Sequence, residues 1–243
     1  LPDSIVGDIP AVPDGMAPSY YLDAQEAIVL VGQAPPEVRY FGFTPYLFAR
    51  TNDEGVRVPV FASLGDTLNH TNLRHASTST FEATFALILT SDSQTQASIS
   101  EALVLSGISE QAINTLVLPR ETLRFGQELS ADAMMLMGRV AFSSSQSAEA
   151  KAAIDAYLSN LPLEVFRVTP SELGEALTAP PRVPRGDGND ELSYVDVLDT
   201  LEDAIIADLA GQYSESVPIM PSPRRVESLK SCVARRSSAS VNI

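Results

Sequence analysis

The stretch FEATFALILTSDSQTQASISEALVLSG, residues 81–107, decides the fold class that we expect for this chain. Its first ten residues, Phe81–Thr90, are rich in apolar and aromatic side chains, which favours a strand. Ser91-Asp92-Ser93 then offers side-chain oxygens that can cap a helix, and the apolar residues of Gln94–Ser106 fall mostly on one helical face. Gly107 ends that helix. The stretch therefore predicts a strand followed directly by a helix.

Four further elements are expected downstream of this pair. They are strands at Ile113–Leu118, Ala133–Phe142 and Leu163–Val168, and a helix at Ala148–Ser159. The three methionines of the Ala133–Phe142 run also suit a helix. The order strand, helix, strand, strand, helix, strand is that of a ferredoxin-like βαββαβ unit. Such a unit is expected to bury Phe85, Leu87, Leu116 and Val165 or their immediate neighbours.

Short apolar runs punctuated by proline and turn residues precede this unit. They span Glu26–Gln33, Val38–Phe43, Tyr46–Arg50 and Arg57–Ala62, and we interpret them as an antiparallel β meander. The expected fold class is thus α+β, with the meander and the βαββαβ unit sharing one body over residues 19–177. Residues 1–18, rich in proline and glycine, are expected to form an extended N-terminal arm.

The sequence after the body divides into three parts. Residues 178–190 are rich in proline and glycine and predict a linker or exposed loop. Residues 191–213 carry apolar side chains every three or four positions and acidic ones elsewhere, so they predict a C-terminal amphipathic helix. This helix could dock on the sheet of its own body or enter the groove of a partner. Residues 214–243 are expected to form a basic, flexible tail.

The charge of the chain argues against some classes of partner. The formal net charge is −15, and the resulting field repels nucleic-acid backbones and anionic lipid. No apolar run approaches the length that a membrane span requires. The segment from Pro221 onward is the exception, because five basic residues against one acidic residue give it a net charge of +4 and leave −19 for the rest. It is either a solvated terminus or a basic strap that docks on an acidic neighbour or on the body itself.

Cysteine and histidine are scarce. The single Cys232 rules out an intrachain disulfide, and the two histidines, His70 and His75, make a metal site improbable, so no cofactor and no metal are predicted. The chain begins with leucine and holds one N-glycosylation sequon at Asn69. These two features slightly favour a secreted or organellar protein that has lost a targeting peptide.

The densest cluster of reactive side chains follows the strand-like run that ends at Ala62. Asp66, Thr67, Asn69 and His70 lie within five residues, and His75 follows nearby. Loops that leave the ends of strands commonly present polar groups to ligands. In the catalytic interpretation His70 or His75 is a general base that Asp66 orients, and Thr67 supplies a hydroxyl. The other interpretation is a solvated polar loop. A sugar attached to Asn69 would crowd His70 and so conflict with the catalytic interpretation.

The triplet Gly65-Asp66-Thr67 resembles the Gly-Asp-Ser block of a family of lipases and esterases, with Thr67 in the place of the nucleophilic serine. The resemblance covers these three residues only. That family places the block at the start of its first strand and has a histidine near the C-terminus, whereas this chain has none after His75. A hydroxyl without a base is a poor nucleophile, so membership of the family is not adopted.

A second cluster lies at Arg39-Tyr40-Phe41-Gly42-Phe43. Alternation along a strand places Arg39, Phe41 and Phe43 on one face and Tyr40 on the other. An arginine beside aromatic rings can hold a carboxylate or a flat ligand. The alternative is that the aromatic rings belong to the core and Arg39 pairs with a carboxylate of the protein.

Two functional hypotheses follow from the sequence. The first is an acidic binding or assembly domain without a catalytic constellation, which binds a protein partner or associates with itself. The second is a hydrolase or lyase that acts on a small anionic substrate through Asp66, Thr67, Asn69 and His70, with Arg39, Tyr40 and His75 as binding residues. A pocket shared by the Asp66–His70 loop and Arg39 would favour the second hypothesis.

Overall fold

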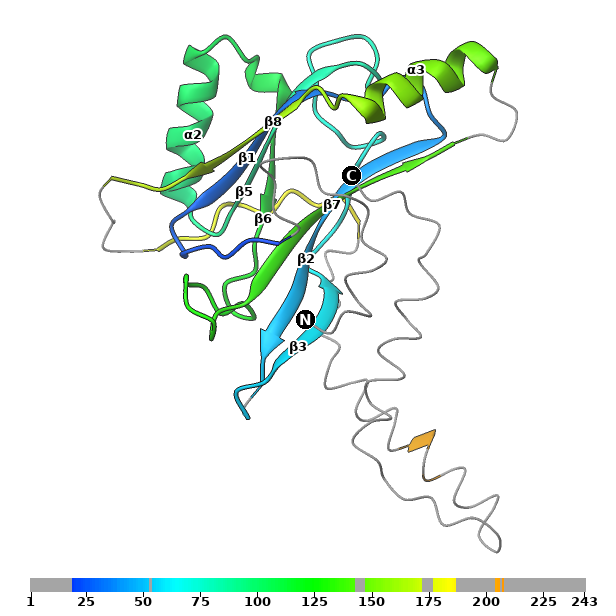
Figure 1. Cartoon of the computed structure of the whole chain (residues 1–243). Helices are drawn as coiled ribbons and strands as arrows, with labels where there is room; N and C mark the ends of the chain where they lie inside the picture. Colours follow the sequence, from blue (N-terminus) through cyan, green and yellow to red (C-terminus); the bar gives the residue numbers. More distant parts are fainter. Residues whose placement is uncertain are drawn as a thin grey trace, which may run out of the picture.

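A computed structural model describes residues 19–52, 54–142, 147–171 and 177–186, together with Ala204, Ile205 and Ala207 (Figure 1). The expected N-terminal arm and the basic tail lie outside the described residues. So does nearly all of the expected C-terminal helix, which is therefore not confirmed. The structure is of mixed α+β type with two sheets and two helices of more than one turn in its described part. None of these helices has the length and apolar character needed to cross a membrane.

The first sheet has the strand order β6-β5-β1-β8. Its strands are β1 (Ala27–Gln33), β5 (Thr84–Thr90), β6 (Ile113–Val117) and β8 (Leu163–Val168). β1 is antiparallel to both β5 and β8, whereas β5 and β6 are parallel. The helix α2 (Ser93–Leu105) connects the parallel pair, as a crossover between parallel strands requires.

The second sheet is built around the long strand β2 (Tyr40–Thr51). β7 (Ala133–Ala141) pairs with one edge of β2, and β3 (Arg57–Ser63) and the short β4 (Leu68–Asn69) pair with the other, all antiparallel. Pro45 lies inside β2, and its carbonyl accepts a hydrogen bond from the amide of Leu64. The missing N–H of Pro45 points to the same edge, in the gap between β3 and β4, so no ladder bond is lost.

The elements expected along residues 81–168 are present with nearly the expected bounds, but they do not share one sheet. β7 leaves the first sheet to pair with β2, and β5 and β6 pair directly instead of being separated by a third strand. The ferredoxin-like arrangement is therefore not confirmed. The expected meander is corrected as well, because β1 lies in the first sheet and the two runs on either side of Pro45 form the single strand β2.

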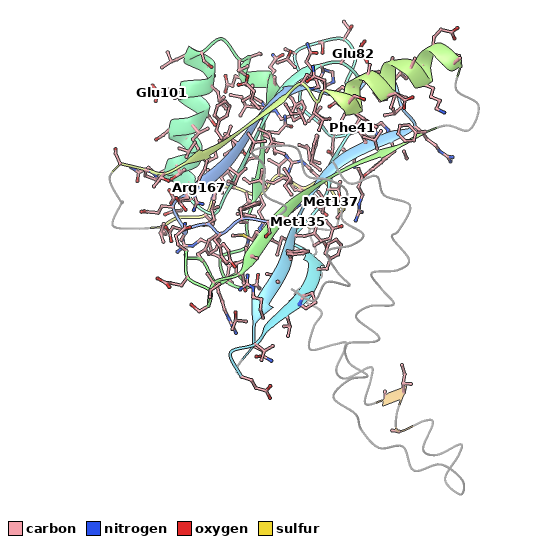
Figure 2. The ribbon with its side chains drawn as sticks, viewed as in Figure 1. Phe41, Glu82, Glu101, Met135, Met137 and Arg167 are labelled. Carbon is pink, nitrogen blue, oxygen red and sulfur yellow. The ribbon has the colours of Figure 1, made fainter. Side chains whose placement is uncertain are left out.

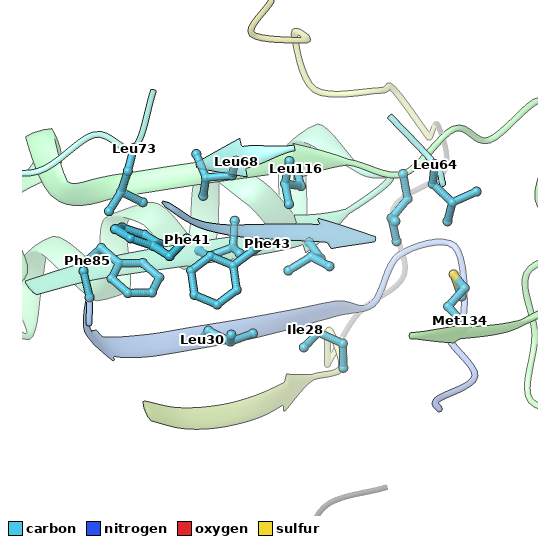
Figure 3. Packing of buried hydrophobic residues seen from close by; sticks show 14 of the residues in the cluster. Ile28, Leu30, Phe41, Phe43, Leu64, Leu68, Leu73, Phe85, Leu116 and Met134 are labelled. Carbon is cyan, nitrogen blue, oxygen red and sulfur yellow. The ribbon is translucent and has the colours of Figure 1, made fainter. Parts of the chain in front are cut away.

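The main core lies between the two sheets (Figure 3). Alternate residues of β1 and β5, among them Leu30 and Phe85, face Phe41 and Phe43 of β2 across it. The expected burial of Phe85, Leu87 and Leu116 is confirmed, with exposed fractions of 0%, 0% and 4%. The expectation for Val165 was wrong, because β8 is an edge strand and none of its residues is buried.

α2 covers the opposite face of the first sheet (Figure 1). Asp92 caps its first turn by accepting a hydrogen bond from the amide of Thr95 at 2.9 Å. Ile99 packs against the outward side chains of β1, β5 and β6. The helix α3 (Ala148–Ser159) instead closes one end of the core with Ile154.

Candidate functional site

The sequence-predicted loop runs along the edge of β2, between the end of β3 and the residues after β4. The amide of Leu64 bonds to Pro45, and the amide of His70 bonds to the carbonyl of Phe41 at 3.1 Å. These two bonds extend the pairing of β3 and β4 with β2 and fix the loop between them. The position of the loop therefore depends on which residues of β2 pair with β3 and β4.

His70 is turned toward the core. Its ring lies 6.1 Å from the rings of Phe41 and Phe81 and 5.6 Å from that of Tyr40. Its Nδ1 atom is buried and has no hydrogen-bond partner among the described residues. Leu68 and His70 are two residues apart, so they share the buried face of the sheet. A histidine in this position packs as part of an aromatic cluster.

Thr67 and Asp66 have different neighbours. The hydroxyl of Thr67 is 2.7 Å from that of Thr44 on β2, on the outer face of the second sheet. One carboxylate oxygen of Asp66 accepts a bond from the amide of Arg185 at 3.3 Å, and the burial of Arg185 lowers the pKa of its guanidinium, a shift that Asp66 opposes. Asp66 thus contacts Arg185, Thr67 contacts Thr44 and His70 contacts the aromatic cluster, so these contacts lie in three different parts of the structure.

The two remaining polar residues of the loop are held by local turns. Oδ1 of Asn69 accepts hydrogen bonds from the amide and hydroxyl of Thr71 at 2.9 and 2.7 Å. His75 contacts the hydroxyl of Thr80 through Nε2 at 3.1 Å, away from the end of β3. Both side chains are partly exposed.

Arg39 immediately precedes β2, and Tyr40 is the first residue of that strand. Arg39 is exposed, whereas Phe41 and Phe43 are buried in the core, so the aromatic residues of this cluster are structural. Burial raises the pKa of the Tyr40 hydroxyl, and the positive charge of Arg139 opposes that shift. Arg139 was not singled out in the sequence.

Arg139 lies on β7, and its register partner on β2 is Gly42. Its guanidinium donates a hydrogen bond to the hydroxyl of Tyr46 and lies 5.5 Å from the centre of that ring. The same outer face carries Met135 and Met137 of β7 (Figure 2). Nothing in the linear sequence connects residue 139 with residues 40–46, because their proximity depends on the pairing of β7 with β2.

An apolar groove of about 510 Å³ lies on the outer face of the first sheet, between α2 and strands β1 and β8. Its apolar lining consists of Val29, Val31, Ile99, Ala102, Leu103, Ile108, Phe166 and Val168. Phe166 is 46% exposed, and Leu105 near the end of α2 is 81% exposed. We call this hollow the α2–β8 groove.

The α2–β8 groove exists because α2 leaves the edge strand β8 uncovered. A helix is about 10 Å wide and strands lie about 4.8 Å apart, so one helix cannot cover all four strands. α2 packs over β5, β6 and the buried Ala27 and Val29 of β1, and the outward side chains of β8 are left beside it. β1 reads Ala-Ile-Val-Leu-Val over residues 27–31, and such a continuous apolar run is typical of a strand that is covered on both faces.

The one charged side chain that lines the groove is acidic, namely Glu164. Glu101, the single charged residue of α2, is exposed but does not line the groove (Figure 2). Arg167 of β8 does not line the groove, because alternation turns it to the other face. There it forms an ion pair with Glu26.

Glu26 is a buried carboxylate with a complete set of donors. It accepts hydrogen bonds from the Arg167 guanidinium, from the Thr169 hydroxyl at 2.6 Å, and from the Asp23 amide and the Gln127 side chain at 2.8 Å each. Burial by itself would raise the pKa of this carboxyl, but the hydrogen bonds outweigh it and lower the pKa to about 2. This network ties β8 to the start of β1 and is structural.

A second, smaller hollow of about 280 Å³ lies at the N-terminus of α2, where Gln25, Asp92 and Thr95 contribute polar atoms. Asp92 and Thr95 bond to each other and to the neighbouring backbone, so they serve the helix cap. Across the described residues, no group of three or more His, Cys, Asp or Glu side chains has a geometry that could hold a metal ion.

Comparison of the chain with protein-family models, with curated proteins and with solved structures finds no match.

Proposed function

We propose that this chain is an acidic, non-catalytic binding domain whose docking surface is the α2–β8 groove. The observation that carries the proposal is the apolar surface of the edge strand β8, where Phe166, which is 46% exposed, and the half-buried Val168 lie beside a single helix in the groove. Exposed apolar side chains that line a groove are a common feature of binding surfaces.

The chemistry of the groove defines the kind of partner. Its lining is apolar apart from Ser98, Ser106 and Glu164, and Glu101 lies on the adjacent helix. A helical segment with an apolar stripe would complete the helix layer, because two helices side by side cover four strands. Basic residues that flank the stripe would meet Glu164. The proposed partner is therefore a basic amphipathic helix.

The alternative of a hydrolase or lyase has less support. It requires Asp66, Thr67 and His70 to converge, but the contacts of His70 are with Phe41 and Phe81 and the hydroxyl of Thr67 is bonded to Thr44. The hydrolase or lyase hypothesis has a test of its own. If a turnover is found, His70→Ala should abolish it and leave the chain folded.

The test of the binding function is a calorimetric titration with two designed 18-residue peptides of the same helical pattern. One has leucine on the apolar face and lysine elsewhere, and the other has glutamate in place of lysine. We expect the lysine peptide to bind and the glutamate peptide not to bind. Phe166→Ala should weaken binding about 5- to 30-fold, because the additional ring area that the peptide buries is worth about 1–2 kcal/mol.

Val165→Ala is the matched control for that variant. Val165 is the neighbour of Phe166 on β8 and is equally exposed at 46%, but it lies on the opposite face of the sheet. Its replacement should leave the affinity unchanged. Equal effects of the two substitutions, or equal binding of both peptides, would refute the proposed docking surface.

A further inference from the structure

We infer that the α2–β8 groove is occupied by residues 224–236 of the same chain, which therefore act as an internal ligand of this site. The inference rests on the proposed function and adds its regulation, because a partner helix would have to displace this segment. It follows from three features: the sequence pattern of the segment, the charge of the groove and the length of the intervening chain.

The segment reads RRVESLKSCVARR. Val226, Leu229 and Val233 are spaced by three and four residues, which places them on one face of a helix. Lys230 and Arg225 flank that face on either side. The segment has 13 residues, as many as α2, so as a helix it would be about 20 Å long, the length of α2 itself.

The charges of the segment and the groove are opposite. The sequence from Pro221 onward has a net charge of +4. The groove holds Glu164, Glu101 lies on the helix beside it, and no basic side chain lines it. The other amphipathic segment, residues 191–213, is strongly acidic and would place carboxylates next to Glu164, so it is the less favourable occupant.

The connection is long enough for docking within one molecule. The last continuous stretch of described backbone ends at Gly186, and 37 residues separate it from Arg224. A chain of that length can span up to about 120 Å, several times the radius of a domain of this size. Attachment to the same chain also raises the effective concentration of the segment, to the order of millimolar, so that weak contacts suffice.

Cys232 provides the test, because the only cysteine of the chain lies inside the proposed ligand. A nitroxide spin label is attached to Cys232 of the full ¹⁵N-labelled chain, and the broadening of backbone amide signals is measured. We expect strong broadening at Val29, Ile99 and Phe166, which line the groove, and none at Thr44 and Thr67, which lie on the outer face of the other sheet.

Charge reversal of the segment gives the main comparison. Arg224, Arg225, Arg235 and Arg236 are all replaced by glutamate, and the matched control replaces the same four residues by lysine. The glutamate variant should lose the broadening at the groove, and the lysine variant should retain it. The glutamate variant should also bind the leucine–lysine peptide several-fold more tightly than the lysine variant, because its groove is free.

Three results would overturn the inference. The first is the absence of broadening at the groove in the labelled chain. For the second, the label is moved to position 199 in a variant with Asp199→Cys and Cys232→Ser. Broadening at the groove from position 199, with none from position 232, would show that the acidic segment is the occupant. The third is broadening that occurs only between a labelled and an unlabelled copy in a mixture.

The failure of this inference can be distinguished from the failure of the proposed function. If the groove binds the leucine–lysine peptide and Phe166→Ala weakens that binding, but the label at Cys232 broadens nothing there, the inference alone is wrong. If no variant binds the peptide at the groove, the proposed function is wrong as well.

Discussion

Replacement of Glu26 by glutamine tests how the uncovered strand β8 is held to the sheet. Glu26 accepts hydrogen bonds from the guanidinium and hydroxyl of two residues at the end of β8, Arg167 and Thr169. Glutamine keeps one acceptor oxygen, but its NH₂ group is a donor. Where this NH₂ group replaces the carboxylate oxygen Oε2, the Asp23 amide and the Gln127 side chain lose their acceptor. Removal of one partner from a buried ion pair typically costs about 3–5 kcal/mol, and the cost here should lie at the lower end because the Arg167 side chain is 39% exposed and water can solvate its charge.

The pKa of Glu26 gives an independent magnitude and a pH window. The pKa of the carboxyl falls from its usual 4.5 to about 2 in the folded protein, which corresponds to about 3 kcal/mol of stabilisation when the group is ionised. Because the folded pKa is the lower one, this contribution is complete above about pH 4.5. It is lost as the pH falls through the window from about 4.5 to 2.

The assay is urea unfolding of the wild type and Glu26→Gln at pH values from 7 to 2. The difference in the free energy of unfolding should be about 3 kcal/mol at pH 7 and should shrink steadily below pH 4.5. Glu121→Gln serves as the control, because Glu121 is exposed and its replacement should change the stability by less than about 0.5 kcal/mol. A difference that stays constant down to pH 2 would refute the role given to the Glu26 carboxylate.

Three further substitutions test the fold. Phe85→Ala should reduce the free energy of unfolding by about 3–5 kcal/mol in urea unfolding, because the ring is fully buried between the sheets, and a loss below 1 kcal/mol would contradict the packing. Asp92→Ala should cost about 1 kcal/mol by thermal unfolding, because the amide of Thr95 loses its cap, and an unchanged melting temperature would argue against the cap. Gly32→Ala should destabilise the chain by more than 1 kcal/mol, because the added Cβ would lie 2.0 Å from the carbonyl oxygen of Pro162, and a neutral effect would contradict this close approach.

The local elements could be predicted from the sequence because each carries its own signals. Asp92 and Ser147 cap the two helices, and turn residues separate the strands. The pairing of the strands could not be predicted in this way. β7 has apolar side chains on both faces and suits either sheet by its pattern, and its pairing with β2 depends on contacts between residues about 90 positions apart.

The candidate sites illustrate the same limit. Alternation along β4 places His70 on the same face of the sheet as Leu68. Once the strand is known, the sequence therefore predicts that the ring of His70 is turned toward the core. The continuous apolar run of β1 likewise indicated a strand with two covered faces. The α2–β8 groove had no such signal, because it arises only when β8 pairs with β1 and a single helix is available to cover four strands.

The most direct test of the proposed docking surface is the detection of nuclear Overhauser effects between the leucine methyl groups of the leucine–lysine peptide and the ring of Phe166 in the full chain. The account predicts cross-peaks from the peptide to Phe166 and to the methyl groups of Val29 and Ile99, all of which line the groove. It predicts none to Val165 on the opposite face of β8. Cross-peaks to Val165, or to the aromatic cluster around His70 with none to Phe166, would contradict the central claim.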